Sequence, residues 1–276
     1  MPAEPGAPSG APSGAPSGMP SGTAFGVPAS PTAAVSFGWG PVEARALLPV
    51  AACVVVLDVL SFTTAVGVAV EAGTAVLPYR WRDESAVAYA REKGAALAVG
   101  RSEATAAHPW SLSPAALRAA PAPERLVLPS PNGSTIAAEA AAGRTAVVAA
   151  SLRNGTAVAH WLAQHGYGTA DRPVAVIASG ERWPDGSLRP ALEDLLGAGA
   201  VLAALREAGA ATLSPEATAA ATLWAATEDP VAALHGCDSG RELYAYGYPQ
   251  DVEVAAEIDA SAVVPVLVDG AFQEAP

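Results

Sequence analysis

Two similar strand–turn–helix units follow one another between residues 126 and 159 of this 276-residue chain. The first reads LVLPS-PNGST-IAAEAAAG and the second reads TAVVAA-SLRNGTA-VA. In each unit a short apolar run, typical of a buried strand, ends at an Asn-Gly turn with a hydroxyl residue, and a helical pattern begins there. Such units predict parallel strands whose turns lie at the same edge of one sheet.

The turns of these two units are candidate phosphate-binding sites. A helix that begins at such a turn exposes backbone N–H groups and carries a partial positive charge, and both features suit an anion. Each turn taken alone is more typical of a capped corner between a strand and a helix. The repetition favours a site, whose candidate residues are Asn132, Gly133 and Ser134 in the first turn and Asn154, Gly155 and Thr156 in the second.

A third corner of the same kind lies earlier in the chain. Residues 51–57 (AACVVVL) form a continuous apolar run, which is typical of a strand covered on both faces. Asp58 ends this run, and Thr63 and Thr64 precede a helical segment that closes at Gly73. A carboxylate in this position can hold a hard cation such as Mg²⁺, or it can cap the following helix, and the sequence leaves both readings open.

A fourth corner follows the apolar run at residues 173–178. That run ends in Ser-Gly-Glu-Arg, which places Glu181 and Arg182 at a strand end. A long helix is predicted over residues 190–207, with Glu193 and Asp194 in its first turn. Acidic residues there stabilise a helix against its dipole, and the alternative reading is that they act as metal ligands near Glu181.

The rest of the chain alternates between strand and helix patterns, which indicates an α/β fold. Residues 1–32 repeat Gly-Ala-Pro-Ser variants and should form a disordered tail, so we expect the folded domain to span residues 33–276. We expect further strands at 35–39, 74–79, 95–99 and 262–268, helices at 83–93, 217–226, 230–235, from 239 and at 249–258, an irregular segment at 100–121 and a loop at 183–189.

Composition restricts the compartment and the partners. The formal net charge of −12 argues against nonspecific binding to nucleic acid or to an anionic membrane. Two cysteines are too few for a disulfide framework, and no apolar run reaches transmembrane length. We therefore expect a cytoplasmic enzyme with a small-molecule substrate, and the sequence leaves self-association open.

Five ordered segments resemble the 2-phosphosulfolactate phosphatase (ComB) family. They are residues 54–66 (VVVLDVLSFTTAV), 129–137 (PSPNGSTIA), 151–159 (SLRNGTAVA), 178–201 (ASGERWPDGSLRPALEDLLGAGAV) and 239–265 (SGRELYAYGYPQDVEVAAEIDASAVVP). The resemblance implies a three-layer α/β/α fold with a mostly parallel or mixed sheet. It also implies a Mg²⁺-dependent phosphatase that hydrolyses (2R)-O-phospho-3-sulfolactate to (2R)-3-sulfolactate and phosphate, a step of coenzyme M synthesis.

The chain departs from the family pattern in two places. The family's Gly-Glu-Arg block after the strand at 95–99 is represented here by Gly100-Arg101, and its Gly-Asn-Ser segment is absent. The family's Thr-Thr-Asn-Gly-Thr reads Ser-Pro-Asn-Gly-Ser. Two alternatives therefore remain, namely a member that binds a phosphorylated or sulfonated metabolite without hydrolysis and a phosphatase for another phosphorylated acid.

Under the phosphatase hypothesis, charge neutralisation and positioning supply the catalysis. We expect Asp58 to hold Mg²⁺ with Glu181 and one of Glu193 or Asp194, and a water activated by the cation to attack phosphorus. An aspartyl-phosphate on Asp58 is the alternative. Asp58 and Glu181 are the expected catalytic residues; the expected phosphate-binding residues are Thr63, Thr64, Asn132, Gly133, Ser134, Arg153, Asn154, Gly155, Thr156 and Arg182.

Overall fold

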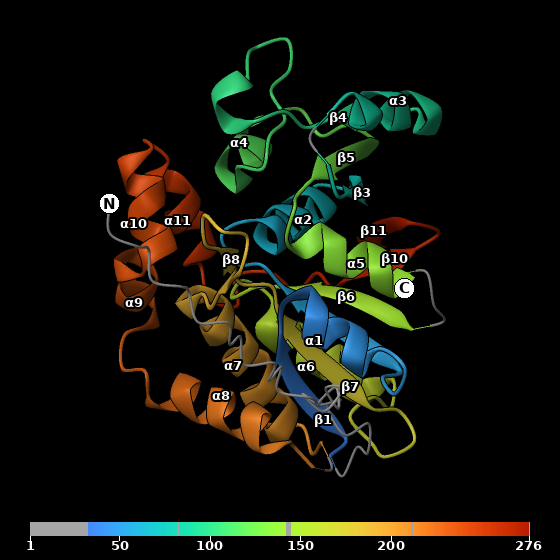
Figure 1. The fold of residues 1–276 in the computed structure, drawn as a ribbon, viewed down its shortest axis with the longest axis vertical. Coiled ribbons are helices and arrows are strands. Elements are labelled where there is room, and N and C mark those ends of the chain that lie inside the picture. The colour runs from blue at the N-terminus through green and yellow to red at the C-terminus, as the bar shows by residue number, and fades with distance from the viewer. Residues whose placement is uncertain (1–32, 82, 142–144, 211, 276) are drawn as a thin grey trace, which may run out of the picture.

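The computed structural model describes residues 33–81, 83–141, 145–210 and 212–275. The tail predicted over residues 1–32 lies outside the described residues. A mixed nine-stranded sheet, whose strands run from residue 35 to residue 274, has helices on both faces (Figure 1). This arrangement confirms the three-layer α/β/α fold.

The apolar runs of the sequence form most of the strands. The strands are β1 (Val35–Trp39), β2 (Cys53–Leu57), β3 (Ala75–Tyr79), β4 (Ala96–Leu97), β5 (Arg125–Pro129), β6 (Ala146–Ala150), β7 (Val174–Ala178), β8 (Glu181–Arg182), β9 (Leu188–Arg189), β10 (Pro265–Val268) and β11 (Ala271–Glu274).

Helices occupy most of the connections between these strands. They are α1 (Gly40–Leu47), α2 (Phe62–Glu71), α3 (Glu84–Lys93), α4 (Pro114–Ala119), α5 (Gly133–Ala141), α6 (Gly155–Gln164), α7 (Leu192–Glu207), α8 (Pro215–Ala226), α9 (Pro230–Gly236), α10 (Asp238–Ala245) and α11 (Pro249–Ala255), with a 3₁₀ turn η1 (Arg101–Glu103).

The sheet consists of two parallel blocks joined by a hairpin. Its strand order is β1-β7-β2-β6-β10-β11-β3-β5-β4, and the β10–β11 hairpin pairs antiparallel to both β6 and β3. Three antiparallel pairings therefore separate β6 from β5, so the second block runs opposite to the first. The prediction that the strands of the two repeated units run parallel is wrong, because the C-terminal hairpin inserts between them.

Each face of the sheet has its own core. Val54 and Val56 of β2 face the cluster that contains α2 and α5, whereas Cys53, Val55 and Leu57 face the cluster that contains α6, α7 and α8. This alternation is the period of two that a strand imposes on side chains, and burial on both faces explains the continuous apolar run. Side chains of β3 and β5 join the α2–α5 cluster as well, so the sheet curls around these two helices.

Five elements differ from the sequence prediction. Helix α1 follows β1 directly, α4 lies within the segment predicted as irregular, β11 completes the C-terminal hairpin, and β8 and β9 form a small hairpin where a loop was predicted. Helix α10 begins at Asp238 rather than at residue 239, and the Cys237 sulfur caps it by accepting from the Gly240 N–H. These elements are short, so they carry little periodic signal.

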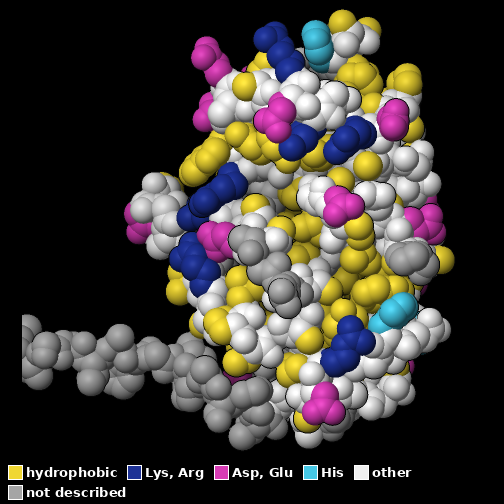
Figure 2. Space-filling model, turned by 90° about the vertical axis from the view of Figure 1, so that its right-hand side faces the viewer, with side chains coloured by type: hydrophobic (Ala, Val, Ile, Leu, Met, Phe, Trp, Pro, Cys, Tyr) yellow, Lys and Arg dark blue, Asp and Glu magenta, His cyan; other side chains and the backbone are white. Residues whose placement is uncertain are grey.

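The surface carries charges of both signs. On the face that Figure 2 shows, basic and acidic side chains are interspersed among apolar ones. Several arginines lie in ion pairs, such as Arg45 with Glu139 and Arg189 with Glu242. Within the described part of the chain, no helix combines the length and the apolar character needed to cross a bilayer.

The contact between α7 and α8 gives a stability prediction. A Cβ at Gly199 would lie 2.5 Å from the Ala220 carbonyl oxygen, whereas a Cβ at Gly67 within α2 would meet nothing within 4 Å. Gly199→Ala should therefore lower the free energy of unfolding by about 1–3 kcal/mol, because the helices must move apart. Gly67→Ala should raise it by up to about 1 kcal/mol, because alanine favours a helix interior. Urea denaturation of both variants measures the two effects, and equal effects would contradict the close α7–α8 contact.

Candidate active site

The carboxyl ends of four parallel strands share one edge of the sheet. Trp39, Ala178, Leu57 and Ala150, which end β1, β7, β2 and β6, lie in register. The corners after β2, β6 and β7 therefore lie side by side, as the sequence predicted. In open α/β sheets this edge is where ligands bind.

Asp58 is held between the first turns of two helices. Its Oδ1 accepts from the Phe62 N–H of α2 at 3.1 Å, and its Oδ2 accepts from the Gly133 N–H of α5 at 2.9 Å. The side chain is buried, and the Ser130 hydroxyl lies 3.5 Å from Oδ2. Asp58 therefore caps α2 with its side chain, which is one of the two roles that the sequence allowed. The same contacts fix its carboxylate at the edge of the sheet.

Gly133 permits this approach of the β5 corner. A Cβ at residue 133 would lie 2.6 Å from the Phe62 ring and 2.8 Å from Asp58 Oδ2, so only glycine fits without displacement. The curl of the sheet therefore brings the corner after β5 to the corner after β2, even though the two strands belong to opposite blocks.

Three further carboxylates surround Asp58. Asp194 joins the corners after β2 and β7, because it accepts from the Val59 N–H at 2.7 Å and from the Gly180 N–H at 2.8 Å. Glu193, its neighbour in the first turn of α7, is buried. Glu181 in β8 accepts from the Asn132 amide at 3.1 Å.

Burial and neighbouring charge raise the pKa values of Asp58, Glu181 and Asp194. Burial raises the pKa of Asp58, and the charge of Glu193 adds to the rise, while the two N–H donors and Arg101 oppose it. Burial, followed by the charges of Asp58 and Glu193, raises the pKa of Glu181 to about 8. The pKa of Asp194 is well above its ordinary value for the same reasons. Like charges gathered in a poorly solvated place disfavour ionisation.

The four carboxylates fit Mg²⁺ in donor type and charge. Hard cations prefer carboxylate oxygens, and Mg²⁺ keeps several waters, so two or three protein ligands suffice. In the described part of the chain, no group of three or more His, Cys, Asp and Glu side chains is already arranged to hold a metal ion. The argument that Mg²⁺ fits this site therefore depends on the repulsion among the carboxylates, because a divalent cation would relieve it.

The hydroxyls of the first and third corners bind the backbone of those corners. The Thr63 hydroxyl donates to the Asp58 carbonyl at 2.9 Å, and the Thr64 hydroxyl donates to the Val59 carbonyl at 2.7 Å. The Ser134 hydroxyl donates to the Tyr79 carbonyl at 2.7 Å. These contacts hold the corners in place, and phosphate binding by these residues stays a prediction.

The second Asn-Gly corner lies at the same edge, but its side chains point into the protein. Asn154 accepts from the Ser151 N–H at 2.8 Å and donates to the Val263 carbonyl at 3.0 Å. Arg153 pairs with Glu71 and Glu257, each at 3.1 Å. The helix that follows this corner begins at Gly155, where a Cβ would meet Ala200 and Val201 of α7.

Thr156 of this corner binds an exposed carboxylate rather than the site. Its hydroxyl donates to Asp259 at 2.7 Å, and its N–H donates to the same carboxylate at 3.0 Å. The structure therefore brings Asn132 into contact with Glu181, one of the four carboxylates, but it does not bring the Asn154 side chain to any of them. The predicted role of the second corner in phosphate binding stays a prediction.

Arg182 lies beside the first Asn-Gly corner. Its Nε donates to the Asn132 side-chain oxygen at 3.3 Å, and its Nη1 donates to the Gly186 carbonyl at 3.2 Å. Its side chain is exposed. It is therefore a cation at the open side of the site, next to Glu181.

Sequence reasoning missed Arg101 and its partners. The Arg101 Nε lies 2.9 Å from Asp251 Oδ2, and its Nη2 lies 2.5 Å from the Ser61 hydroxyl at the start of α2. Asp251 is completely buried and also accepts from the Ser113 hydroxyl. The segment predicted as irregular is thus fastened beside the Asp58 corner. The one available signal was Gly100-Arg101, where the chain departs from the family pattern.

Ser179 was noted only as part of a polar turn. It follows β7 in register with Asp58, and its N–H donates to the Leu57 carbonyl at 2.7 Å. Its hydroxyl is buried and has no hydrogen-bond partner among the residues that the structure describes. Buried hydroxyls are usually paired, so this one is available to a bound group.

Comparison with known proteins assigns this site to a family. A sequence model described as 2-phosphosulpholactate phosphatase matches residues 43–270, a span that includes all five resembling segments. The chain belongs to this family. It is thereby classed with the phosphoric monoester hydrolases.

Curated relatives cover most of the chain. A protein of Deinococcus radiodurans named probable 2-phosphosulfolactate phosphatase is 31% identical over 218 residues, which is 78% of this chain and 87% of that protein. A protein of Thermus thermophilus with the same name is 33% identical over 218 residues, again 78% of this chain and 87% of that protein. One of Synechococcus sp., also with this name, is 34% identical over 148 residues, or 53% of this chain and 56% of that protein.

Glu181 should make the stability of the cation-free protein depend on pH. Its folded pKa of about 8 lies above its ordinary value of 4.5, so the folded state keeps a proton that the unfolded state loses first. The stabilisation is present below about pH 4.5 and is lost as the pH rises to about 8. Glu181→Gln should flatten the stability curve across this window and should be more stable than the wild type at its upper end.

Urea denaturation in the presence of a chelator, over about pH 5 to 9, measures this effect. The exposed Glu124→Gln serves as the control and should follow the wild-type curve. Parallel curves for the wild type and Glu181→Gln would mean that Glu181 titrates alike in the folded and unfolded states.

Proposed function

We propose that this chain is a Mg²⁺-dependent phosphatase that hydrolyses a small phosphorylated acid, and that (2R)-O-phospho-3-sulfolactate is this acid. Membership of the family supports the reaction class. The observation that carries the proposal is Asp58, which backbone N–H groups of α2 and α5 fix among three other carboxylates. The setting of coenzyme M synthesis and a cytoplasmic location belong to the same proposal.

Asp58, Glu181 and one of Glu193 or Asp194 would hold the cation. When bound, Mg²⁺ supplies charge neutralisation for the phosphoryl oxygens and activates a water for attack. Asp194 also fixes the relative positions of the corners after β2 and β7 through its two backbone contacts. Asp58 is already held rigidly, so its carboxylate needs little rearrangement in the reaction.

The residues around Glu181 would bind and orient the phosphoryl group. Asn132 links Glu181 to Arg182, so the amide fixes both side chains at the open side of the site. Arg182 presents a guanidinium, which suits phosphate oxygens. The Ser179 hydroxyl, which is buried and unpaired among the described residues, offers a further hydrogen bond to the bound substrate.

Asp58→Asn tests the catalytic assignment. Asparagine keeps the size of the side chain but removes the negative charge, so Mg²⁺-dependent phosphate release should fall by orders of magnitude while the fold is kept. Release of phosphate from a panel of phosphorylated acids, with Mg²⁺ or with a chelator, measures this. The exposed Asp171→Asn should retain wild-type rates. Near-normal rates in Asp58→Asn would remove Asp58 from the mechanism.

The same panel separates the alternatives for substrate choice. Phosphate release from other acids but not from phosphosulfolactate would assign a different substrate. Binding without any phosphate release would favour a family member that has lost catalysis.

Mg²⁺ should stabilise the folded protein in a way that depends on pH. Metal binding requires ionised carboxylates, so a cation must displace the proton that Glu181 keeps up to about pH 8. We expect Mg²⁺ to raise the Tm of the wild type more at pH 8.5 than at pH 6. At roughly a hundredfold excess over Kd, binding adds about 2–3 kcal/mol to the free energy of unfolding. Glu181→Gln should show a smaller increase. A Tm unaffected by Mg²⁺, together with full activity in a chelator, would refute the cation assignment.

A further inference from the structure

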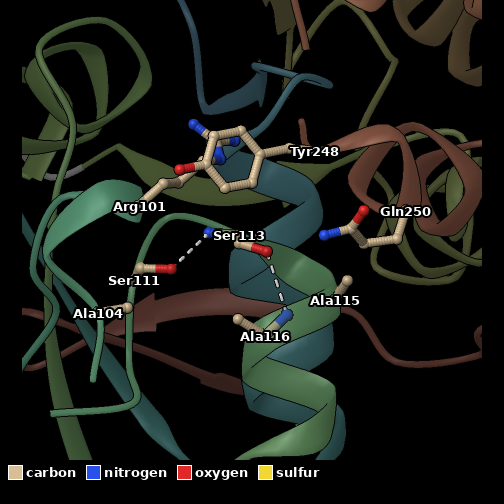
Figure 3. Close-up of a pocket in the computed structure, with 8 residues that line it drawn as sticks. All are labelled: Arg101, Ala104, Ser111, Ser113, Ala115, Ala116, Tyr248 and Gln250. Atoms are coloured by element: carbon tan, nitrogen blue, oxygen red, sulfur yellow. Dashed lines mark hydrogen bonds between the residues drawn. The ribbon is translucent and has the colours of Figure 1, made fainter. Parts of the chain in front are cut away.

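A small cavity with both polar and apolar lining lies between the segment around η1 and the start of α11. Its volume is about 240 Å³, and its polar lining consists of Arg101, Ser111, Ser113, Tyr248 and Gln250. Figure 3 shows Arg101 next to the Tyr248 ring, and the amide nitrogen of Gln250 points toward the middle of the cavity. Binding sites for drug-sized ligands usually occupy about 300–1,000 Å³, so this cavity suits a group of a few atoms.

Arg101 presents one free edge of its guanidinium. Its Nε binds Asp251, and its Nη2 binds the Ser61 hydroxyl and the Leu112 carbonyl. No hydrogen bond among the described residues involves its Nη1, and this atom is not among their buried unpaired atoms. The Nη1 group is therefore accessible to a ligand.

The acidic partner of Arg101 is shielded from the cavity. Asp251 is completely buried, and its Oδ1 accepts from the Ser113 hydroxyl and from the Ala115 N–H at 3.3 Å. The polar lining groups that remain are a guanidinium, hydroxyls and an amide. This set of donors suits a carboxylate or a sulfonate.

Ser61 connects the cavity residue Arg101 to the Asp58 corner. Ser61, which binds Arg101 at 2.5 Å, immediately precedes Phe62, whose N–H binds Asp58 at 3.1 Å. Arg101 is also close enough to lower the pKa of Asp58. A small molecule with a phosphate at Asp58 can therefore place a neighbouring acid group near Arg101.

We propose that this cavity, called the Arg101 cavity, binds the non-reacting carboxylate or sulfonate of the phosphorylated substrate. Arg101 thereby selects phosphomonoesters that carry a second negative charge. The proposal rests on the proposed function for the identity of the substrate, and the binding of the acid group can be measured without turnover.

The decisive experiment is calorimetric titration of 3-sulfolactate in the presence of Mg²⁺. This probe carries both acid groups but no phosphate, so its binding does not depend on hydrolysis. Arg101→Lys keeps a positive charge beside Asp251 but loses the forked donor edge, and it should weaken binding about tenfold or more. Gln250→Leu leaves the Arg101–Asp251 pair intact and should also weaken binding.

Arg45→Lys is the matched control, because Arg45 forms an exposed ion pair with Glu139 away from the cavity. It should bind the probe as the wild type does, and thermal unfolding should show that all variants are folded. Equal binding by the wild type and Arg101→Lys, or no binding by the wild type, would overturn the proposal.

A parallel phosphate-release assay separates the two proposals. If Arg101-dependent binding is seen but no phosphomonoester is hydrolysed, the phosphatase proposal fails and the cavity assignment stands. If Arg101→Lys raises KM equally for phosphosulfolactate and for a neutral phosphomonoester, the cavity assignment fails and the phosphatase proposal stands. A rise of about tenfold confined to phosphosulfolactate would support both.

Discussion

The site depends on the burial of like charges at one edge of the sheet. Asp58, Glu193, Asp194 and Glu181 come from three separate segments. Burial raises the pKa of Asp58, Glu181 and Asp194, and the charge of Glu193 adds to each rise. Backbone N–H groups offset part of this cost at Asp58 and Asp194, because the helix starts and corners point their donors at these carboxylates. The remaining repulsion is what makes this group of residues suited to a cation and a charged substrate.

The shape of the sheet determines which corners take part. The hairpin of β10 and β11 reverses the strand direction between the two parallel blocks, and the sheet curls around α2 and α5. This curl brings Gly133 to Asp58, and the missing Cβ of glycine allows the contact. The second Asn-Gly corner shares the edge of the first block, yet its polar side chains bind the segment that leads into β10.

The segment after β4 is one of the places where this chain differs from the family pattern, and it carries Arg101. Residues 100–115 contain this departure from the family pattern, and hydrogen bonds of Arg101 and Ser113 to the buried Asp251 hold this segment against α11. A buried carboxylate without its partners would be costly, so these contacts specify where the segment lies. The same contacts place an arginine next to the corner that holds Asp58.

The sequence by itself determined the local units and the residue types of the site. Apolar runs that end at Asp58, at the Asn-Gly turns and before Glu181 encode strands and helix starts, because periodicity and capping act over a few neighbouring residues. The sequence also predicted that Asp58, Asn132, Asn154 and Glu181 meet at one edge of the sheet. The structure joins Asn132 to Glu181 and Gly133 to Asp58, but it does not bring the Asn154 side chain to them. Only the tertiary structure decided that Asn154 turns inward, that the two blocks run in opposite directions and that Arg101 reaches Ser61. These features depend on pairings between residues far apart in the chain, and no local pattern carries that information.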